Sequence, residues 1–263
     1  IIYRQNRPLR NTIKYHIECY EKYSESDVFY YNIENTLPFY IKKIPWNIII
    51  FHTTFLIARQ DKNTFDKFLL KIGFIKNQTC HKVALPQDEA GGGKMLCSFF
   101  LEFKVNVIYS LLFEKKDITR IYSKILDKVL IRNTLAAYVD ENEINKYKRL
   151  HNRSKKIKFS YRTFSAKSRN GILGNMKIKI GEVFKKHLSK TNFKYDISMD
   201  VNDTILGQDW IKFLCDSEFT LGIEGGSSLY DPEYIFFKRC KSYEEKNPNA
   251  SFNEIMKNCF EGE

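Results

Sequence analysis

The feature that most constrains the fold is a regular alternation of short apolar runs with longer segments of helical spacing. The apolar runs have the length of strands, and several of them lack the polar alternation of a half-exposed strand. Continuous apolar strands are typical of a sheet that is covered on both faces. The expected strands are Val28–Ile33, Asn47–Phe51, Lys82–Leu85, Val105–Leu111, Ile157–Tyr161, Tyr195–Ser198 and Phe219–Ile223.

Segments with the spacing of amphipathic helices separate these runs. Strand followed by helix, repeated along the chain, predicts an α/β architecture with doubly wound parallel sheets. In the last segment Ser251 stands three residues before Glu254, as in a capping box, and Pro248 indicates a helix that stops and restarts. The expected helices are Asn11–Tyr23, Thr54–Ile72, Asp117–Ile131, Met176–Leu188, Asp209–Cys215 and Tyr243–Cys259.

A polar, highly charged stretch over residues 140–158 predicts a boundary between two α/β halves. We therefore expect two Rossmann-like domains, residues 1–150 and residues 151–263. The second is short for a complete doubly wound domain, so we expect that it is truncated.

Composition places the chain among folded globular proteins, because 43% of the residues are hydrophobic and 28% are charged. No run reaches the roughly 18 consecutive apolar residues that a membrane span needs. The cysteines form no C-x-x-C pair and, beyond the adjacent Cys80-His81, have no histidine at metal-ligand spacing. We therefore expect reduced thiols in a cytoplasmic protein that binds no metal.

The net charge of +12 admits two interpretations. An excess of lysine and arginine favours anionic partners such as nucleic acid, phosphorylated sugars or a membrane surface, and abundant Tyr and Phe could stack on bases. The lysines are scattered, however, and a chain rich in Lys, Asn, Ile, Tyr and Phe together shows the bias of an AT-rich genome. We favour a solvated basic surface and keep a basic nucleic-acid-binding module as the alternative.

Polar residues follow several of the apolar runs. In open parallel sheets, ligands bind beyond the carboxyl ends of the strands, so these residues are the first candidates for a site. They are His52, Gln87-Asp88-Glu89, Arg162, Ser198 with Asp200, and Glu224-Gly225-Gly226-Ser227-Ser228.

The strongest local motif is L-G-I-E-G-G-S-S-L-Y-D over residues 221–231. Adjacent glycines after a strand allow positive φ and close approach of backbone amides to an anion, although an ordinary glycine-rich turn fits equally well. The motif is not a P-loop and lacks the spacing of a dinucleotide fingerprint. Gly171 and Gly174 form a second pair near Arg162 and Arg169, before an expected helix whose amino terminus would favour phosphate.

Residues of three kinds at this rim could serve acid–base chemistry. Asp88 or Glu89 could supply a carboxylate base or bind a sugar hydroxyl, while a polar turn after Pro86 is the simpler interpretation. His52 could be a general base for a hydroxyl acceptor, although a lone histidine after a buried strand is more often structural.

Two further features receive no function from the sequence. His16, His81, His151 and His187 have no partner that the sequence identifies. The Ala90-Gly91-Gly92-Gly93 stretch stands out from the Ile- and Lys-rich remainder, as an artificially replaced loop would, and does not enter the functional argument.

Taken in order, the motifs resemble a family of bacterial glycosyltransferase-like proteins of the GT-B type, which have two Rossmann-like halves facing a cleft. The order and spacing of several motifs carry the resemblance, which runs almost from end to end of the chain. The segments are Ile50-Phe51-His52 with Phe55-Leu56 and Arg59, K-V-A-L-P-Q-D-E over 82–89, Tyr161-Arg162, Leu173-Gly174 with Lys177 and Gly181, Asp196-Ile197-Ser198, Asp209-Trp210 with Phe213-Leu214, and L-G-I-E-G-G-S-S over 221–228.

The resemblance implies sugar transfer from a nucleotide-diphosphate donor to a hydroxyl acceptor, in glycan or surface polysaccharide synthesis. It implies an acceptor in the amino-terminal half and a donor in the carboxyl-terminal half, with no metal and no cofactor besides the nucleotide-sugar substrate. The implied general base is His52, Asp88 or Glu89. The implied donor-binding residues are Arg162, Lys177, Glu224, Gly225, Gly226, Ser227 and Ser228.

Two departures from the family pattern keep a third interpretation open. The pattern continues beyond the segment that matches residues 249–262, so the donor half is expected to be incomplete here. A Tyr or other polar residues are expected where Ala90-Gly91-Gly92-Gly93 stands. A non-catalytic, glycosyltransferase-like binding scaffold is therefore a further alternative.

Overall fold

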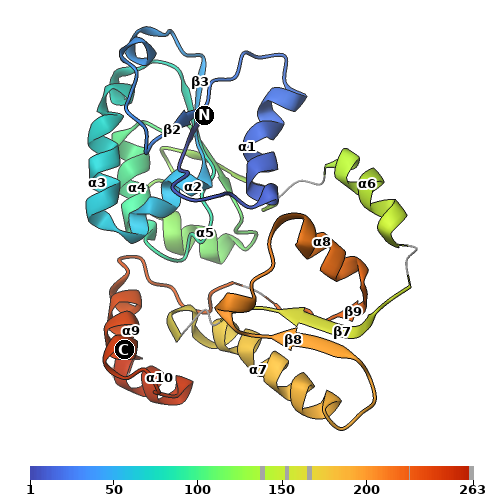
Figure 1. Cartoon of the computed structure of the whole chain (residues 1–263). Helices are drawn as coiled ribbons and strands as arrows, with labels where there is room; N and C mark the ends of the chain where they lie inside the picture. Colours follow the sequence, from blue (N-terminus) through green and yellow to red (C-terminus); the bar gives the residue numbers. More distant parts are fainter. Residues whose placement is uncertain (137–139, 152–153, 165–167, 225, 261–263) are drawn as a thin grey trace. The chain divides into compact units, whose positions relative to one another are not determined.

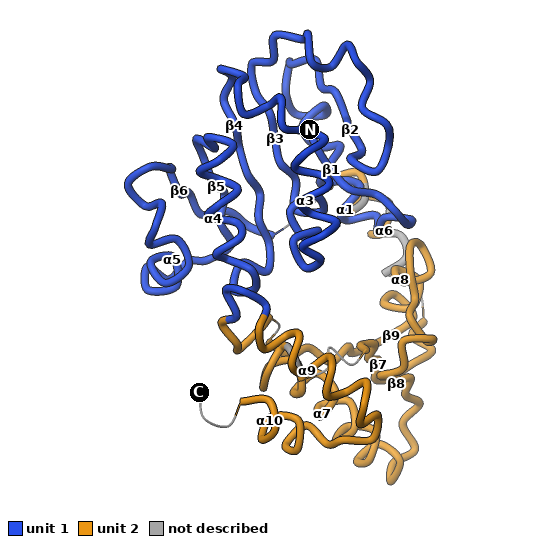
Figure 2. The backbone as a smooth tube through the Cα atoms, turned by 90° about the vertical axis from the view of Figure 1, so that its left-hand side faces the viewer, with its two compact units in different colours: residues 1–138, 231–234 blue, residues 139–230, 235–263 orange. Residues whose placement is uncertain are grey.

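The chain is an α/β protein with a parallel sheet in each of two compact units. One unit contains residues 1–138 and 231–234, and the other contains residues 139–230 and 235–263 (Figure 2). The sequence did not predict that residues 231–234 belong to the first unit. The computed structural model describes residues 1–136, 140–151, 154–164, 168–224 and 226–260 (Figure 1).

Unit 1 is built on a six-stranded sheet with the order β2-β1-β3-β4-β5-β6 among the described residues. All neighbouring strands are parallel, as the continuous apolar runs predict. The sequence did not predict β1 or β6. β1 is too short to form an apolar run, and β6 overlaps the end of the expected helix Asp117–Ile131. The strands are β1 (Ile2–Tyr3), β2 (Tyr31–Asn32), β3 (Ile48–Phe51), β4 (His81–Ala84), β5 (Val107–Ser110) and β6 (Leu130–Asn133).

The helices of unit 1 differ from the expected ones in three ways, the first being the helix Gly93–Glu102, which no expected helix covers. The expected helix over 54–72 is broken, because the Asp61 side chain accepts a hydrogen bond from the Asn63 amide and starts a new helix there. The expected helix over 117–131 is wrong in its second half, because the helix ends at Tyr122, turns follow, and from Leu130 the chain pairs with β5. The helices are α1 (Asn11–Tyr23), α2 (Thr53–Leu56), α3 (Lys62–Lys71), α4 (Gly93–Glu102) and α5 (Lys115–Tyr122).

An aromatic cluster forms the core of unit 1. α1 lies on one face of the sheet and α3 and α4 lie on the other, as right-handed connections from a doubly wound sheet require (Figure 1). On the α3 and α4 face, Phe51 of β3 packs edge-on against Phe99 at 4.9 Å between ring centroids, and Phe55 and Phe65 pack beside them. All four rings are buried, which fixes the end of β3.

Unit 2 has a three-stranded parallel sheet with the order β8-β7-β9 among the described residues. β7 (Ile157–Arg162), β8 (Tyr195–Ser198) and β9 (Ser217–Thr220) confirm three expected strands, the last displaced toward the amino terminus. The helices are α6 (Glu141–His151), α7 (Gly171–Leu188), α8 (Gly207–Cys215), α9 (Ile235–Lys246) and α10 (Phe252–Phe260).

The predicted interruption near Pro248 is confirmed, because α9 ends at Lys246 and α10 begins at Phe252. The Ser251 hydroxyl accepts the Glu254 amide at 3.2 Å, as in a capping box. The Glu254 carboxylate instead accepts the Tyr243 hydroxyl at 3.1 Å and so ties the two helices together.

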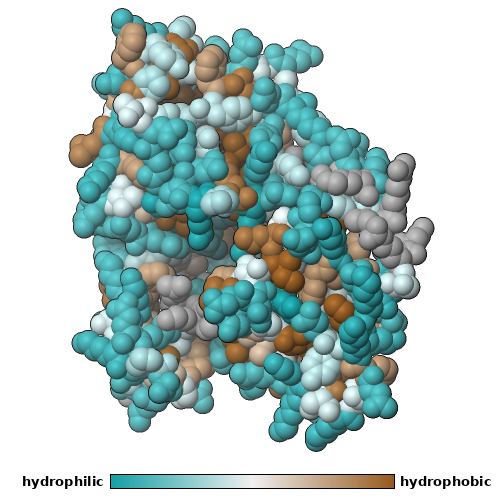
Figure 3. All heavy atoms as spheres, viewed as in Figure 1, coloured by the Kyte–Doolittle hydropathy of each residue, from teal (hydrophilic) through white to brown (hydrophobic). Residues whose placement is uncertain are grey.

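The state of the cysteines and the polarity of the surface agree with what the composition predicts for a folded globular protein. The six cysteines are free, and Cys97, Cys240 and Cys259 are buried. Within the described residues, no helix combines the length and the apolar character needed to cross a bilayer. Hydrophilic residues cover most of the surface visible in Figure 3.

Candidate functional site

Each sheet contains a topological switch point, a pair of neighbouring strands from which the strand order continues in opposite directions along the sheet. In unit 1, β1 lies beside β3, and in unit 2, β7 lies beside β9. In open parallel sheets, the crevice outside the carboxyl ends of such strand pairs is the preferred place for a ligand. The expected site residues His52, Arg162 and Glu224 stand at or after the ends of β3, β7 and β9.

His52 is fully buried and forms the amino-terminal cap of α2. Its Nδ1 accepts the backbone amide of Thr54 at 3.2 Å, and its Nε2 lies 2.9 Å from Nδ1 of His16 on α1. A backbone amide can only donate, so the neutral His52 ring carries its hydrogen on Nε2 and donates it to His16.

Burial keeps this pair of rings neutral. Burial, followed by the neighbouring His16, lowers the pKa of His52 to about 3. Burial also lowers the pKa of His16, which is only half-buried. His52 has no exposed surface, and its two ring nitrogens face His16 and the Thr54 hydroxyl, which lies 3.0 Å from Nδ1, so a proton from a ligand would pass through one of these side chains. The sequence left His16 without a partner, since the two residues are 36 positions apart.

Arg59 braces the loop that follows β4. Its side chain is almost fully buried and donates to the backbone carbonyls of Leu56, Gln87, Asp88 and Gly91 at 2.9–3.1 Å. The guanidinium fork matches several carbonyls at once, so one side chain fixes the backbone of this loop. The resemblance included Arg59 but gave it no role.

The two carboxylates of this loop have different environments. Glu89 is buried and accepts hydrogen bonds from the Tyr122 hydroxyl at 2.6 Å and from the Ser110 hydroxyl and the Leu111 amide at 3.0 Å. Burial raises the pKa of Glu89 despite these donors. Asp88 is exposed and has a left-handed backbone with φ of 53°. Asp88 is thus the carboxylate that solvent reaches, and Glu89 ties the loop to β5 and α5.

The Ala90-Gly91-Gly92-Gly93 stretch is an integral part of unit 1. The Gly92 amide donates to the Asp231 carbonyl and the Asp231 amide donates to the Ala90 carbonyl, both at 2.9 Å. A Cβ at Gly92 would lie 2.3 Å from the Tyr234 ring, and its φ is +67°. The glycines of this stretch let residues 231–234 pack against the β4 loop, so the stretch has a structural role in unit 1.

In unit 2, Arg162 ends the central strand β7. Its guanidinium donates to the Asp196 carboxylate at 2.7 Å and to the carbonyls of Tyr161 and Asp196 at 3.0 and 3.1 Å. It also lies over the Phe213 ring of α8, with 4.6 Å to the centroid. Arg162 therefore joins β7 to β8, and its charge remains at the carboxyl edge of the sheet.

The loop after β9 lies against the amino end of α7. The amide and the hydroxyl of Ser228 donate to the Asn170 carbonyl at 3.2 and 3.4 Å. A Cβ at Gly171 would lie 2.3 Å from the Ser228 hydroxyl oxygen, so loop and helix start are in close contact.

The predicted donor-binding residues of this loop are accessible. Glu224, Gly226, Ser227 and Ser228 are exposed, and Gly226 has a φ of +112°. Gly225 lies outside the described residues. Lys177 lies six positions after the start of α7, roughly 9 Å along the helix, and its carbonyl accepts the Tyr161 hydroxyl. The structure therefore brings the loop, rather than Lys177, to the amino end of α7.

A search for a metal site in the described residues and a comparison with known proteins identify no further site residue. Among the described residues, no three His, Cys, Asp or Glu side chains come together as a metal site. Comparison of the chain with protein-family models, curated proteins and solved structures found no match.

Proposed function

We propose that this chain binds a nucleotide-diphosphate sugar in unit 2 and takes part in its transfer to a hydroxyl acceptor, as a glycosyltransferase of the GT-B type. The observation that carries the proposal is the glycine-rich loop after β9, which lies against the amino end of α7 beside the β7–β9 switch point. Backbone amides of a helix start and of a glycine-rich loop together favour a phosphate group.

The exposed groups of unit 2 suit a diphosphate. The exposed hydroxyls of Ser227 and Ser228 donate to the carbonyls of Leu229 and Asn170, and each would turn from its carbonyl to a phosphate. Gly226 leaves its surroundings open, since nothing lies within 4 Å of a Cβ built there. Arg162 is mostly buried and paired with Asp196, and it places a guanidinium at the end of β7, where a leaving diphosphate would compete with Asp196 for its charge. Glu224 is exposed and is assigned to the hydroxyls of the donor.

The acceptor chemistry is assigned to unit 1. Asp88 is the exposed carboxylate after β4 and serves as general base, because proton transfer from a hydroxyl needs an accessible acceptor. His52 acts through His16, to which it is hydrogen-bonded, and Glu89 positions the loop that carries Asp88. In this assignment only Asp88 touches the acceptor.

A binding assay with a matched pair of glycine variants tests the donor site. Thermal shifts with UDP-, GDP-, ADP- and CMP-sugars are measured at two salt concentrations, because a ligand that binds the native state raises its stability. We expect a shift with one nucleotide class that persists at high salt and is weakened at least tenfold by Gly226→Ala. Gly222→Ala is the control, since Gly222 has equal space around it and no left-handed φ.

Two results would contradict the proposal. Equal binding by Gly226→Ala and the parent protein would remove the β9 loop from the site. A shift with single-stranded DNA alone, lost at high salt, would favour the nucleic-acid-binding alternative.

A further inference from the structure

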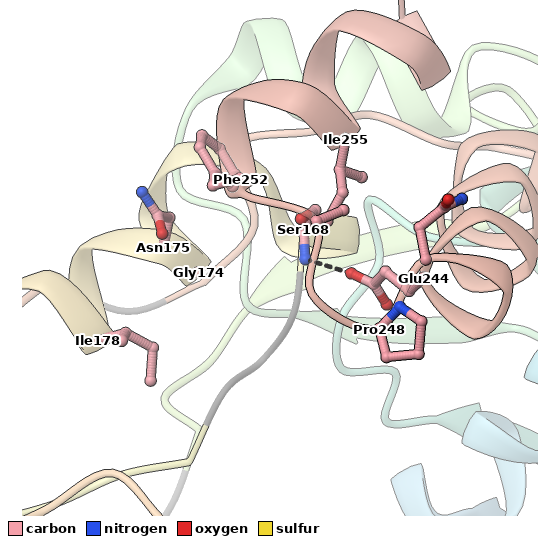
Figure 4. A pocket seen from close by; sticks show the side chains of 10 residues that line it. Ser168, Gly174, Asn175, Ile178, Glu244, Pro248, Phe252 and Ile255 are labelled. Atoms are coloured by element: carbon pink, nitrogen blue, oxygen red, sulfur yellow. Dashed lines mark hydrogen bonds between the residues drawn. The ribbon is translucent and has the colours of Figure 1, made fainter.

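A separate cavity of about 290 Å³ lies in unit 2 between α7 and the α9–α10 pair (Figure 4). Gly174 of α7 contributes no side chain, which leaves room beside Asn175 and Ile178. Glu244 and Pro248 line the opposite side, near the end of α9. A volume of this size is at the lower end for ligand pockets and suits one ring system or a nucleoside.

The polar groups of the cavity are carboxamides and a carboxylate. In the described part of the chain, the Asn175 carboxamide makes no hydrogen bond, so its donors and its acceptor are available. Asn247 uses its amide nitrogen on the Tyr243 carbonyl at 3.0 Å and keeps its oxygen as an acceptor. Glu244 accepts the Ser168 amide at 3.0 Å, and a carboxylate has lone pairs for further donors.

The remaining lining is apolar or neutral. Phe252 and Ile255 of α10 and Ile178 of α7 give the cavity its apolar lining, in which Phe252 contributes a flat ring (Figure 4). None of the lining residues that the structure describes is a lysine or arginine, while Glu244 brings an acidic group. This combination disfavours a phosphate or carboxylate ligand and favours a ring with apolar faces and hydrogen-bonding hydroxyls at its edge.

We infer that this cavity binds a neutral, hydroxyl-bearing ring, the chemistry shared by a saccharide unit and a ribonucleoside. The ring hydroxyls donate to Glu244 and to the Asn247 oxygen, and they accept from the Asn175 amide. One face of the ring packs on Phe252. The inference does not depend on donor binding at the β9 loop, because the two sets of residues are different.

Calorimetric titration separates the two sources of such a ring. Methyl glycosides of glucose, galactose, mannose and N-acetylglucosamine form one arm, and uridine, cytidine, adenosine and guanosine form the other. Saccharide binding supports an independent glycan site, and nucleoside binding supports a site for the nucleoside of a larger ligand. No response in either arm at millimolar ligand would overturn the inference.

Variants within α7 locate the binding. Asn175→Leu removes the carboxamide and fills space, and we expect it to weaken binding at least tenfold. Lys179→Leu is the control on the same helix, because Lys179 is exposed and outside the cavity. Glu244→Gln, which keeps an acceptor for the Ser168 amide, should weaken binding about fivefold.

The variant Gly226→Ala distinguishes the two proposals. We expect it to lose nucleotide-sugar binding at the β9 loop and to keep ring binding in the cavity. Binding that Asn175→Leu leaves unchanged would show that the ligand lies elsewhere and would overturn the assignment to this cavity.

Discussion

The loops that follow β4 and β9 both carry glycines and both leave the carboxyl edge of a parallel sheet, yet they are held in opposite ways. The β4 loop is braced from within, since buried Arg59 donates to three of its carbonyls and buried Glu89 ties it to β5 and α5. The β9 loop is exposed from Gly226 to Ser228 and is held to α7 through the Asn170 carbonyl.

The glycines of the two loops have different structural roles. Gly92 permits close packing, because a side chain there would meet Tyr234. Gly226 permits an unusual backbone in open space, because nothing lies near a Cβ built there. The β4 loop is thus fixed by contacts inside unit 1, whereas the β9 loop keeps Gly226, Ser227 and Ser228 exposed.

The largest expected effect is the loss of the brace in the β4 loop. Arg59→Ala removes the guanidinium donor from the carbonyls of Leu56, Gln87, Asp88 and Gly91, of which the Asp88 carbonyl keeps the Gly91 amide. Each buried unsatisfied group costs about 1–3 kcal/mol, so we expect the free energy of unfolding to fall by about 4 kcal/mol in urea denaturation. Arg7→Ala, at an exposed position, should change it by less than about 0.5 kcal/mol.

The second prediction concerns the acid sensitivity that His52 confers. The unfolded ring takes up a proton near pH 6.5, while the folded ring does so near pH 3. Between these values the unfolded state binds more protons, so stability is present above pH 6.5 and is lost as the pH falls toward 3. One such group gives a slope of up to about 1.4 kcal/mol per pH unit.

His52→Gln should flatten this part of the pH–stability curve, as measured by urea denaturation at half-unit intervals. His16 also has a lowered pKa, so some slope should remain until both rings are replaced. His187→Gln, at an exposed position on α7, should keep the parent slope. An unchanged slope in His52→Gln would contradict the prediction, because it would show that the folded ring takes up its proton at the same pH as the unfolded ring.

The third prediction tests the close packing in the β4 loop. Gly92→Ala places a Cβ 2.3 Å from the Tyr234 ring at a left-handed φ, so we expect a loss of about 2 kcal/mol. Gly73→Ala is the matched control, because nothing lies within 4 Å of its Cβ position and its φ is not left-handed. A similarly small loss of stability in both variants would mean that the packing of residues 231–234 against the β4 loop does not require a glycine at position 92.

The sequence predicted the parts of the fold that depend on local pattern. α1 has the predicted bounds, and β3, β4, β5, β7 and β8 lie in or beside the predicted apolar runs. β1 has only two residues, so it carries no periodicity, and α4 was not predicted, because it begins at Gly93 in a glycine-rich stretch that disfavours a helix. Short or glycine-rich elements are decided by their tertiary partners.

The sequence predicted which residues of the candidate site follow the strands. It did not predict which side chains of the site contact one another. His52 and Asp88 were identified because they follow apolar strands, and the structure places them after neighbouring strands. The His16–His52 pair spans 36 positions and the Arg59–Asp88 contact 29, and no local periodicity reports which side chains meet over such distances. The separation of Asp88 and Glu89 into exposed and buried carboxylates likewise needed the fold.

The smallest expected effect on stability belongs to the open loop, and it sharpens the comparison most. Gly226→Ala meets no neighbouring atom, and an exposed loop can relax its backbone, so we expect a loss of no more than about 1 kcal/mol, against about 2 for Gly92→Ala. Gly222→Ala should stay within about 0.5 kcal/mol in the same denaturation. A loss at Gly226 as large as that at Gly92 would mean that the β9 loop is also rigidly held, so its glycines would be explained by structure alone. A small loss of stability combined with a large loss of nucleotide-sugar binding is the result that only a ligand-binding loop produces.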